Sequence, residues 1–151
     1  MHVGRHALTR FAALLLAMAA APPAAALEFR CVGENPAILY DGPTTKSSRV
    51  YVVSRGYPLE VVVAVEGWVK VRDANGAFSW IEARQLSDKR NVMVKAKVAD
   101  VRSRPDDAAP VAFQAEQNVL LELVRVSGSW VQVRHRDGAV GFIRAQQVWG
   151  A

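Results

Sequence analysis

Apolar and polar residues alternate along this chain in short runs that are separated by turn residues. Residues 59–65 are mostly apolar, Glu66-Gly67 interrupts them, and residues 68–72 alternate between valine and aromatic or charged side chains. Runs of this length, rich in Val, Leu, Ile and aromatic residues, are typical of β-strands joined by tight turns. The strand period of two predicts that Val69 and Val71 face the core, while the tryptophan, lysine and arginine around them face outward.

Turn and helix patterns support an all-β fold. The dipeptides Asn75-Gly76 and Asp137-Gly138 predict two-residue hairpins of type I′, which require a positive φ at both central positions. No stretch beyond residue 26 predicts an amphipathic helix of substantial length, although residues 83–85 and 145–147 suit single 3₁₀ turns.

The pattern occurs twice along the chain, at one constant spacing and without a gap. The aligned pairs include a proline, a tryptophan and a turn glycine: Pro43 with Pro105, Trp68 with Trp130, and Gly76 with Gly138. We therefore predict two domains, 29–88 and 92–150, joined by a polar stretch. A domain of about 60 residues has a marginal core, so packing of the two domains together would stabilise both.

The second domain resembles a known family. Residues 99–105 read ADVRSRP, 128–134 read GSWVQVR and 137–143 read DGAVGFI. This succession resembles the bacterial SH3 domain. The first domain is a degenerate copy, which keeps GWVKVR at 67–72 but has SWI at 79–81 where the family has Gly-Trp-Val.

The resemblance implies two tandem SH3-like β-barrels that serve in bacterial envelopes as non-catalytic recognition modules, often for peptidoglycan peptides or partner proteins. Eukaryotic relatives bind proline-rich ligands with a proline and a tyrosine near the last 3₁₀ turn. Arg144 and Gln147, or Glu82 and Gln85, stand at those positions here. The resemblance therefore does not extend to proline-rich recognition.

Residues 1–26 are typical of a removable signal peptide. They contain no acid, carry Arg5 and Arg10, run apolar from residue 11 to 21 and end in alanines. We expect cleavage to leave Leu27 as the first residue of a periplasmic or secreted protein without membrane insertion. A lipid anchor on Cys31 is disfavoured, because Glu-Phe-Arg rather than small residues precede it.

Charge and reactive side chains exclude several functions. Loss of the two leader arginines lowers the formal net charge from +5 to +3, and the remaining basic residues are scattered, so we expect no nucleic-acid binding. Cys31 and His135, the only Cys and the only His beyond residue 26, supply neither a nucleophile with its base nor a zinc site. We expect no enzyme activity, metal or cofactor.

Cys31 itself falls outside both repeat cores in this interpretation and has no partner in the chain. In an oxidising compartment, it is expected either to be buried or to form a disulfide-linked dimer.

The candidate ligand-binding residues are the aromatic side chains opposite the core valines and the arginines on the same strands. They are Tyr40, Trp68, Arg72, Trp80, Trp130, Arg134 and Phe142. Such a patch suits a peptide that carries a carboxylate, through stacking and ion pairing. Alternatively, the tryptophans seal a barrel end or the interface between domains, and the arginines form surface pairs across the sheet. We expect replacement of Trp130 to affect mainly a ligand and replacement of Trp68 mainly stability.

The sequence thus predicts an exported, non-catalytic module that recognises peptidoglycan peptides or an envelope protein. The alternative is a structural adaptor, whose two barrels pack together and present a surface to a larger assembly.

Overall fold

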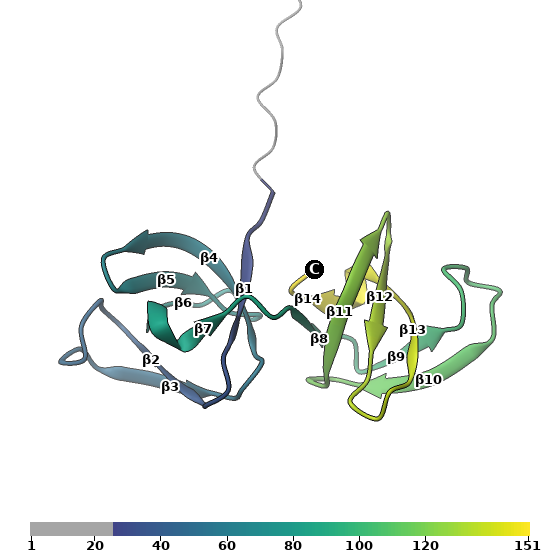
Figure 1. The fold of residues 1–151 in the computed structure, drawn as a ribbon, viewed down its shortest axis with the longest axis horizontal. Helices are drawn as coiled ribbons and strands as arrows, with labels where there is room; N and C mark the ends of the chain where they lie inside the picture. Colours follow the sequence, from purple (N-terminus) through teal and green to yellow (C-terminus); the bar gives the residue numbers. More distant parts are fainter. Residues whose placement is uncertain (1–25) are drawn as a thin grey trace, which may run out of the picture.

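A computed structural model describes residues 26–151 and folds them into two all-β units, each built on one seven-stranded antiparallel sheet (Figure 1). The predicted leader falls on residues outside this range, apart from Ala26. The first unit contains β1 (Phe29–Val32), β2 (Ala37–Tyr40), β3 (Arg49–Val53), β4 (Pro58–Val65), β5 (Trp68–Arg72), β6 (Phe78–Glu82), η1 (Ala83–Gln85) and β7 (Leu86–Ser87). The second contains β8 (Asn91–Val94), β9 (Val98–Arg102), β10 (Val111–Glu116), β11 (Leu120–Ser127), β12 (Trp130–Arg134), β13 (Val140–Arg144), η2 (Ala145–Gln147) and β14 (Val148–Trp149).

The repeat in the sequence is a repeat in the structure. The strands run in the orders β3-β2-β6-β5-β4-β1-β7 and β10-β9-β13-β12-β11-β8-β14, which correspond element by element. Strands β5 and β12 begin at the aligned tryptophans, and the long strands β4 and β11 carry a bulge at the same place, after Val61 and after Leu123. The predicted 3₁₀ turns are present as η1 and η2. The all-β fold with two SH3-like barrels is therefore confirmed.

Each unit has its own core, built by the predicted alternation. Val69 and Val71 are buried, whereas Trp68, Lys70 and Arg72 are partly exposed on the other face of β5. The second core is formed in the same way and includes Val131 and Val133. Because successive residues of a strand face opposite sides of the sheet, this alternation was readable from the sequence.

The hairpin turns differ from the predicted type I′. The glycines of Asn75-Gly76 and Asp137-Gly138 have φ of 86° and 94°, but among residues 26–151 only Asn118 combines a side chain with a positive φ. In the first hairpin, the Gly76 amide donates to the Asp73 carbonyl and the Asp73 amide donates to the Ala77 carbonyl, each at 3.0 Å. This is a three-residue loop, in which a type I turn precedes a left-handed glycine. The prediction of a two-residue loop was wrong, because the dipeptide suits both turns.

Another glycine in the second unit is required by close packing. A Cβ on Gly141 would lie 2.7 Å from Val101 Cγ1 and 2.8 Å from the Arg102 carbonyl oxygen. Strand β13 therefore passes β9 at a distance that admits no side chain at this position, although the first unit accommodates Ser79 at the matching site.

Cys31 is buried, but it belongs to neither of the two core clusters, in agreement with the prediction that it falls outside both repeat cores; its Sγ contacts Asn91 of β8 in the second unit. It is the third residue of β1, and 1% of its surface is exposed. The Asn91 amide donates to its Sγ over 3.2 Å. Burial raises the pKa of the thiol, although this hydrogen bond and the nearby Arg90 charge oppose the shift. The buried position is one of the two predicted alternatives, and a disulfide-linked dimer would require the contact between Cys31 and Asn91 to open.

We expect Cys31 to resist alkylation in the folded protein, because neither its geometry nor its raised pKa favours an accessible thiolate. Mass spectrometry after brief iodoacetamide treatment should find an unmodified folded chain and a modified chain in urea. Rapid alkylation without denaturant would contradict this burial.

The two units contact one another through the end of β14, which lies between them (Figure 1). Trp149 packs edge-on against Phe29 with ring centroids 5.0 Å apart, and its indole Nε1 donates to the Pro58 carbonyl over 2.9 Å. Arg90 donates to the Gly150 carbonyl over 2.7 Å. The second unit thus places its C-terminal aromatic residue against β1 and β4 of the first.

Candidate binding groove

The second unit has a groove whose base is formed by Trp130 and Arg144. These residues pair directly across strands β12 and β13. Trp130 is 7% exposed, and the Arg144 guanidinium carbon lies 4.2 Å from its ring centroid. A guanidinium over an indole face is attracted by the ring electrons. The tryptophan is therefore buried in part by a cation rather than by core side chains alone.

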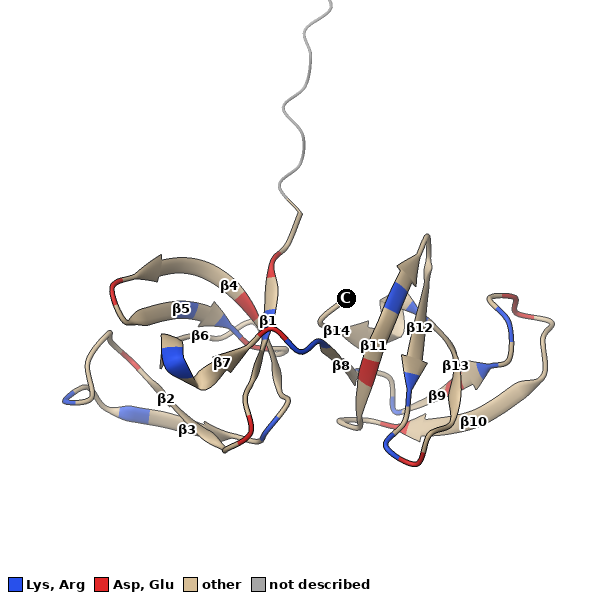
Figure 2. Cartoon of the chain, viewed as in Figure 1, with Lys and Arg blue, Asp and Glu red and all other residues tan. Residues whose placement is uncertain are grey.

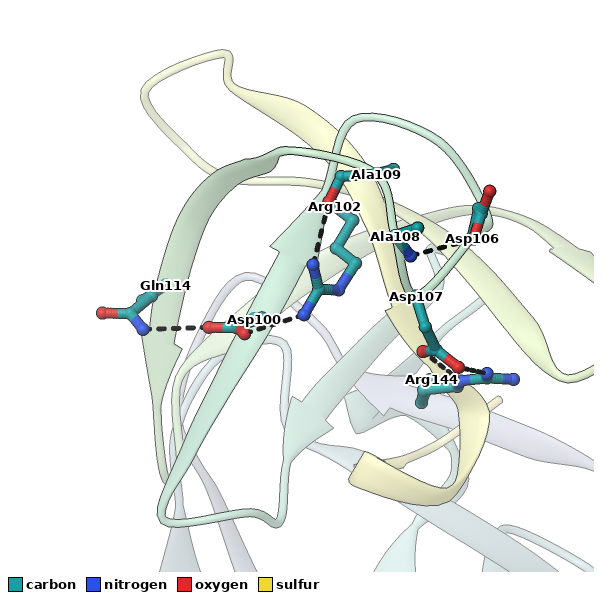
Figure 3. Close-up of polar contacts among 8 residues, drawn as sticks. All are labelled: Asp100, Arg102, Asp106, Asp107, Ala108, Ala109, Gln114 and Arg144. Carbon is teal, nitrogen blue, oxygen red and sulfur yellow. Dashed lines mark hydrogen bonds and ion pairs between the residues drawn. The ribbon is translucent and has the colours of Figure 1, made fainter.

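Arg144 also holds the loop that connects β9 to β10 over the groove. Its Nε donates to Asp107 over 3.2 Å, and a second guanidinium nitrogen contacts the same carboxylate (Figure 3). The Arg144 Nη1 also lies 3.0 Å from Ser129 Oγ. A carboxylate that receives two parallel N–H groups from arginine has a defined orientation. The position of Asp107 is thus coupled to that of Arg144.

A second arginine fixes the same loop at its other end. Arg102 donates to the Ala109 carbonyl over 2.8 Å and to Asp100 over 3.1 Å (Figure 3). The Gln114 side-chain amide donates to the other oxygen of Asp100 over 2.9 Å. Strands β9 and β10 and the loop between them are therefore linked by a continuous set of polar contacts.

These side chains surround a shallow cavity of about 510 Å³. Its lining residues are Val98, Asp100, Arg102, Asp107, Gln114, Trp130, Arg144, Gln146 and Gln147. Two arginines and two aspartates give the groove both signs of charge and no formal net charge. Such a lining is suited to a ligand that carries both an ammonium and a carboxylate group.

The structure brings three of the predicted aromatic residues together in the first unit. Tyr40 and Trp68 pack edge-to-face with centroids 5.4 Å apart, and Tyr40 lies opposite Trp80 across β2 and β6. Tyr40 is buried, whereas both tryptophans are partly exposed. In the second unit, Phe142 lies opposite Arg102 and outside the lining of the groove, so only Trp130 of the predicted aromatic residues belongs to it.

The two predicted arginines lie away from the groove. Arg72 pairs across the sheet with Glu60, its Nε donating over 2.7 Å, and its guanidinium carbon is 5.7 Å from the Trp149 ring centroid. Arg134 pairs with Glu122 over 3.2 Å. Both arrangements correspond to the alternative of cross-strand ion pairs. Trp130 and Arg134 share a strand face but stand four residues apart, which separates them by about 13 Å.

Sequence reasoning missed Arg144, Arg102 and Asp107 as members of this site. One signal was available for Arg144, which replaces an apolar groove residue of the eukaryotic SH3 relatives. The replacement indicated that proline-rich ligands would not bind, but it did not show that the Arg144 guanidinium covers Trp130.

Two small barrels in tandem, with a shallow charged groove on the second, define a tandem β-barrel binding protein. The family model for the bacterial SH3 domain matches residues 33–88 and 95–150, so its two matches begin at residues that the repeat aligns. The chain belongs to the bacterial SH3 domain family. Domains of this family are binding modules.

Solved structures resemble the chain only weakly, and no curated protein sequence matches it. NlpC1 from Trichomonas vaginalis is 14% identical with a TM-score of 0.39, over 92% of this chain and 51% of its own. An NlpC/P60 family protein from Bacillus cereus is 14% identical with a TM-score of 0.37, over 81% of this chain and 56% of its own. The chain spans about half the length of these proteins, and likenesses this weak assign it no activity.

The described part of the chain, residues 26–151, contains no helix that is long and apolar enough to span a membrane. Nor does it gather three or more His, Cys, Asp or Glu side chains in a metal-binding arrangement.

Proposed function

We propose that this protein is an exported, non-catalytic module that recognises peptidoglycan peptides, or an envelope protein, through the groove around Trp130 and Arg144. The observation that carries the proposal is the juxtaposition of two arginines and two aspartates with the covered indole face of Trp130. Peptide stems of the cell wall carry amino and carboxylate groups together, so they offer partners to both signs of charge.

Recognition would proceed by exchange of ion-pair partners. The Asp107 side chain is 70% exposed and that of Arg144 is 31% exposed, so water already weakens this pair. A ligand carboxylate can accept N–H groups from Arg144 while a ligand ammonium binds Asp107 or Asp100. The features of residues 1–26 support export, and hence a periplasmic or secreted location.

The groove is tested by replacing Arg144 with glutamine and measuring retention of the chain without its leader on purified peptidoglycan. We expect at least a fivefold loss of affinity, which corresponds to about 1 kcal/mol. Free stem peptide should compete for the unaltered protein.

Arg84→Gln is the matched control. Arg84 lies in η1 of the first unit and forms a comparable exposed ion pair with Glu82. Its replacement should leave retention unchanged. Full retention of the Arg144→Gln protein would reject the groove as the site of recognition.

The adaptor remains the second candidate function, and the contact between the units favours it. Trp149, Phe29 and Arg90 hold the barrels against one another, as expected of a rigid spacer. If peptidoglycan does not retain the protein while one envelope protein copurifies with it in a stable ratio, the adaptor is supported instead.

A further inference from the structure

A second cavity lies between the two units and is separate from the groove around Trp130. Its volume is about 670 Å³, and its walls come from the first unit, the connecting segment and the second unit. The segment joining β7 to β8 carries Lys89 and Arg90, and its blue stretch lies between the two units in Figure 2. Neither repeat forms this inter-unit cleft alone.

The walls of the inter-unit cleft are held in place by Asn91. Its side-chain Nδ2 donates to the Gly56 carbonyl over 3.0 Å, and its backbone amide donates to Cys31 Sγ over 3.2 Å. Asn91 is also the first residue of β8, so one residue joins the sheets of both units. The cleft is therefore preformed, and a ligand does not have to order it.

Basic side chains outnumber acidic ones around the cleft. Arg55 and Lys89 share a single carboxylate, that of Glu34, over 3.6 and 3.1 Å. On the opposite wall, Arg134 pairs with Glu122. Arg136 also lines the cleft and forms no ion pair with any side chain of residues 26–151. Four basic residues thus face two carboxylates.

The existing ion pairs are open to exchange. The side chains of Arg55 and Lys89 are 70% and 80% exposed, and exposed pairs contribute little to stability. The hydrogen bond from Lys89 is the largest of the causes that lower the pKa of Glu34. An anionic ligand would therefore be attracted by the excess positive charge without breaking a buried pair.

The cleft also has an apolar component. The partly exposed side chains of Val119 and Leu120 contribute to its lining, beside the backbone of Gly33 and Gly56. An inorganic polyphosphate chain has no apolar groups to place against these side chains. An acidic peptide with interspersed apolar residues complements both features.

We propose that the cleft between the two units binds an acidic peptide segment carrying apolar side chains, such as an exposed strand or tail of another protein. This site does not depend on the proposed recognition of cell-wall peptides. It uses residues of both repeats, which gives the tandem arrangement a function that a single barrel lacks.

The probe is a short fluorescent peptide in which Glu and Leu alternate, titrated against the chain without its leader by fluorescence anisotropy. Saturable binding that weakens as salt is raised is expected. A peptide with Gln at every Glu position should bind at least about tenfold more weakly. Equal binding of the neutral peptide would overturn the proposal, as would equally tight binding of inorganic polyphosphate.

Two variants with the same change in charge locate the site. Arg136→Glu should weaken binding of the Glu-Leu peptide about tenfold, because it places a carboxylate on the cleft wall. Arg104→Glu alters an exposed loop residue of the same unit outside the cleft and should change binding less than twofold.

Equal losses in the two charge-reversal variants would show that overall charge, and not the cleft, attracts the peptide, and would overturn the proposal. Arg144→Gln should leave binding of the Glu-Leu peptide intact. A result that contradicts peptide binding in the cleft can therefore be distinguished from one that contradicts recognition in the groove around Trp130.

Discussion

Replacing Trp130 with alanine is expected to lower the free energy of unfolding of the second unit by about 3–5 kcal/mol. The indole is only 7% exposed, and Arg144 lies against its face. Truncation would leave a cavity beside the sheet and remove the surface on which the guanidinium rests. Urea unfolding of the whole chain, followed by the fluorescence of the other tryptophans, measures the loss.

Two further variants separate packing from recognition. Trp68→Ala removes the matching, partly exposed tryptophan and should cost less than Trp130→Ala, which reverses the order expected from the sequence. Arg144→Gln retains the indole and removes a partly exposed ion pair, so it should cost no more than about 1 kcal/mol. Unchanged unfolding of the Trp130→Ala protein would contradict a packing role.

Replacing Trp149 with alanine is expected to destabilise the contact between the two units by about 2–3 kcal/mol, from one hydrogen bond, one aromatic pair and the lost apolar contact. Trp149 donates to the Pro58 carbonyl and packs on Phe29, both in the first unit. Small barrels gain stability by mutual packing. Scanning calorimetry should therefore find that the variant unfolds in two separate transitions where the unaltered chain unfolds in one.

The repeat offers a matched control for this variant. Ser87 occupies the position in β7 that corresponds to Trp149 in β14. Ser87→Ala changes a residue of the first unit without removing the aromatic contact, so its calorimetric profile should keep a single transition. A single, unshifted transition for Trp149→Ala would indicate that the two barrels unfold together for another reason.

The alternation of valines in β5 and β12, the constant spacing of the repeat and the two 3₁₀ turns were all evident in the sequence. Each depends on local rules, namely the strand period of two and the conformations that turn residues prefer. The resemblance to the bacterial SH3 domain was evident for the same reason, because each motif of that family is a contiguous run of residues. Even here, the hairpin dipeptides did not distinguish a two-residue from a three-residue loop.

The candidate site was predictable only in part. Trp130 was identified from its repeat, whereas Arg144 and Asp107, which complete the groove, come from β13 and from the loop between β9 and β10. Arg72 and Arg134 share a strand face with the tryptophans, but each is paired with a glutamate on the adjacent strand. A strand pattern gives the face of a side chain but not the neighbour across the sheet.

The sequence by itself determined the fold class, the duplication and the alternation of core and surface residues, because these follow from periodicities within single strands and turns. Only the tertiary structure decided that Trp130 is covered by Arg144, that Cys31 is buried in β1 and that Trp149 joins the two units. These outcomes depend on contacts between residues far apart in the chain, as between Phe29 in the first strand and Trp149 in the last. Such contacts form only when strand register and the packing of the two barrels are fixed together.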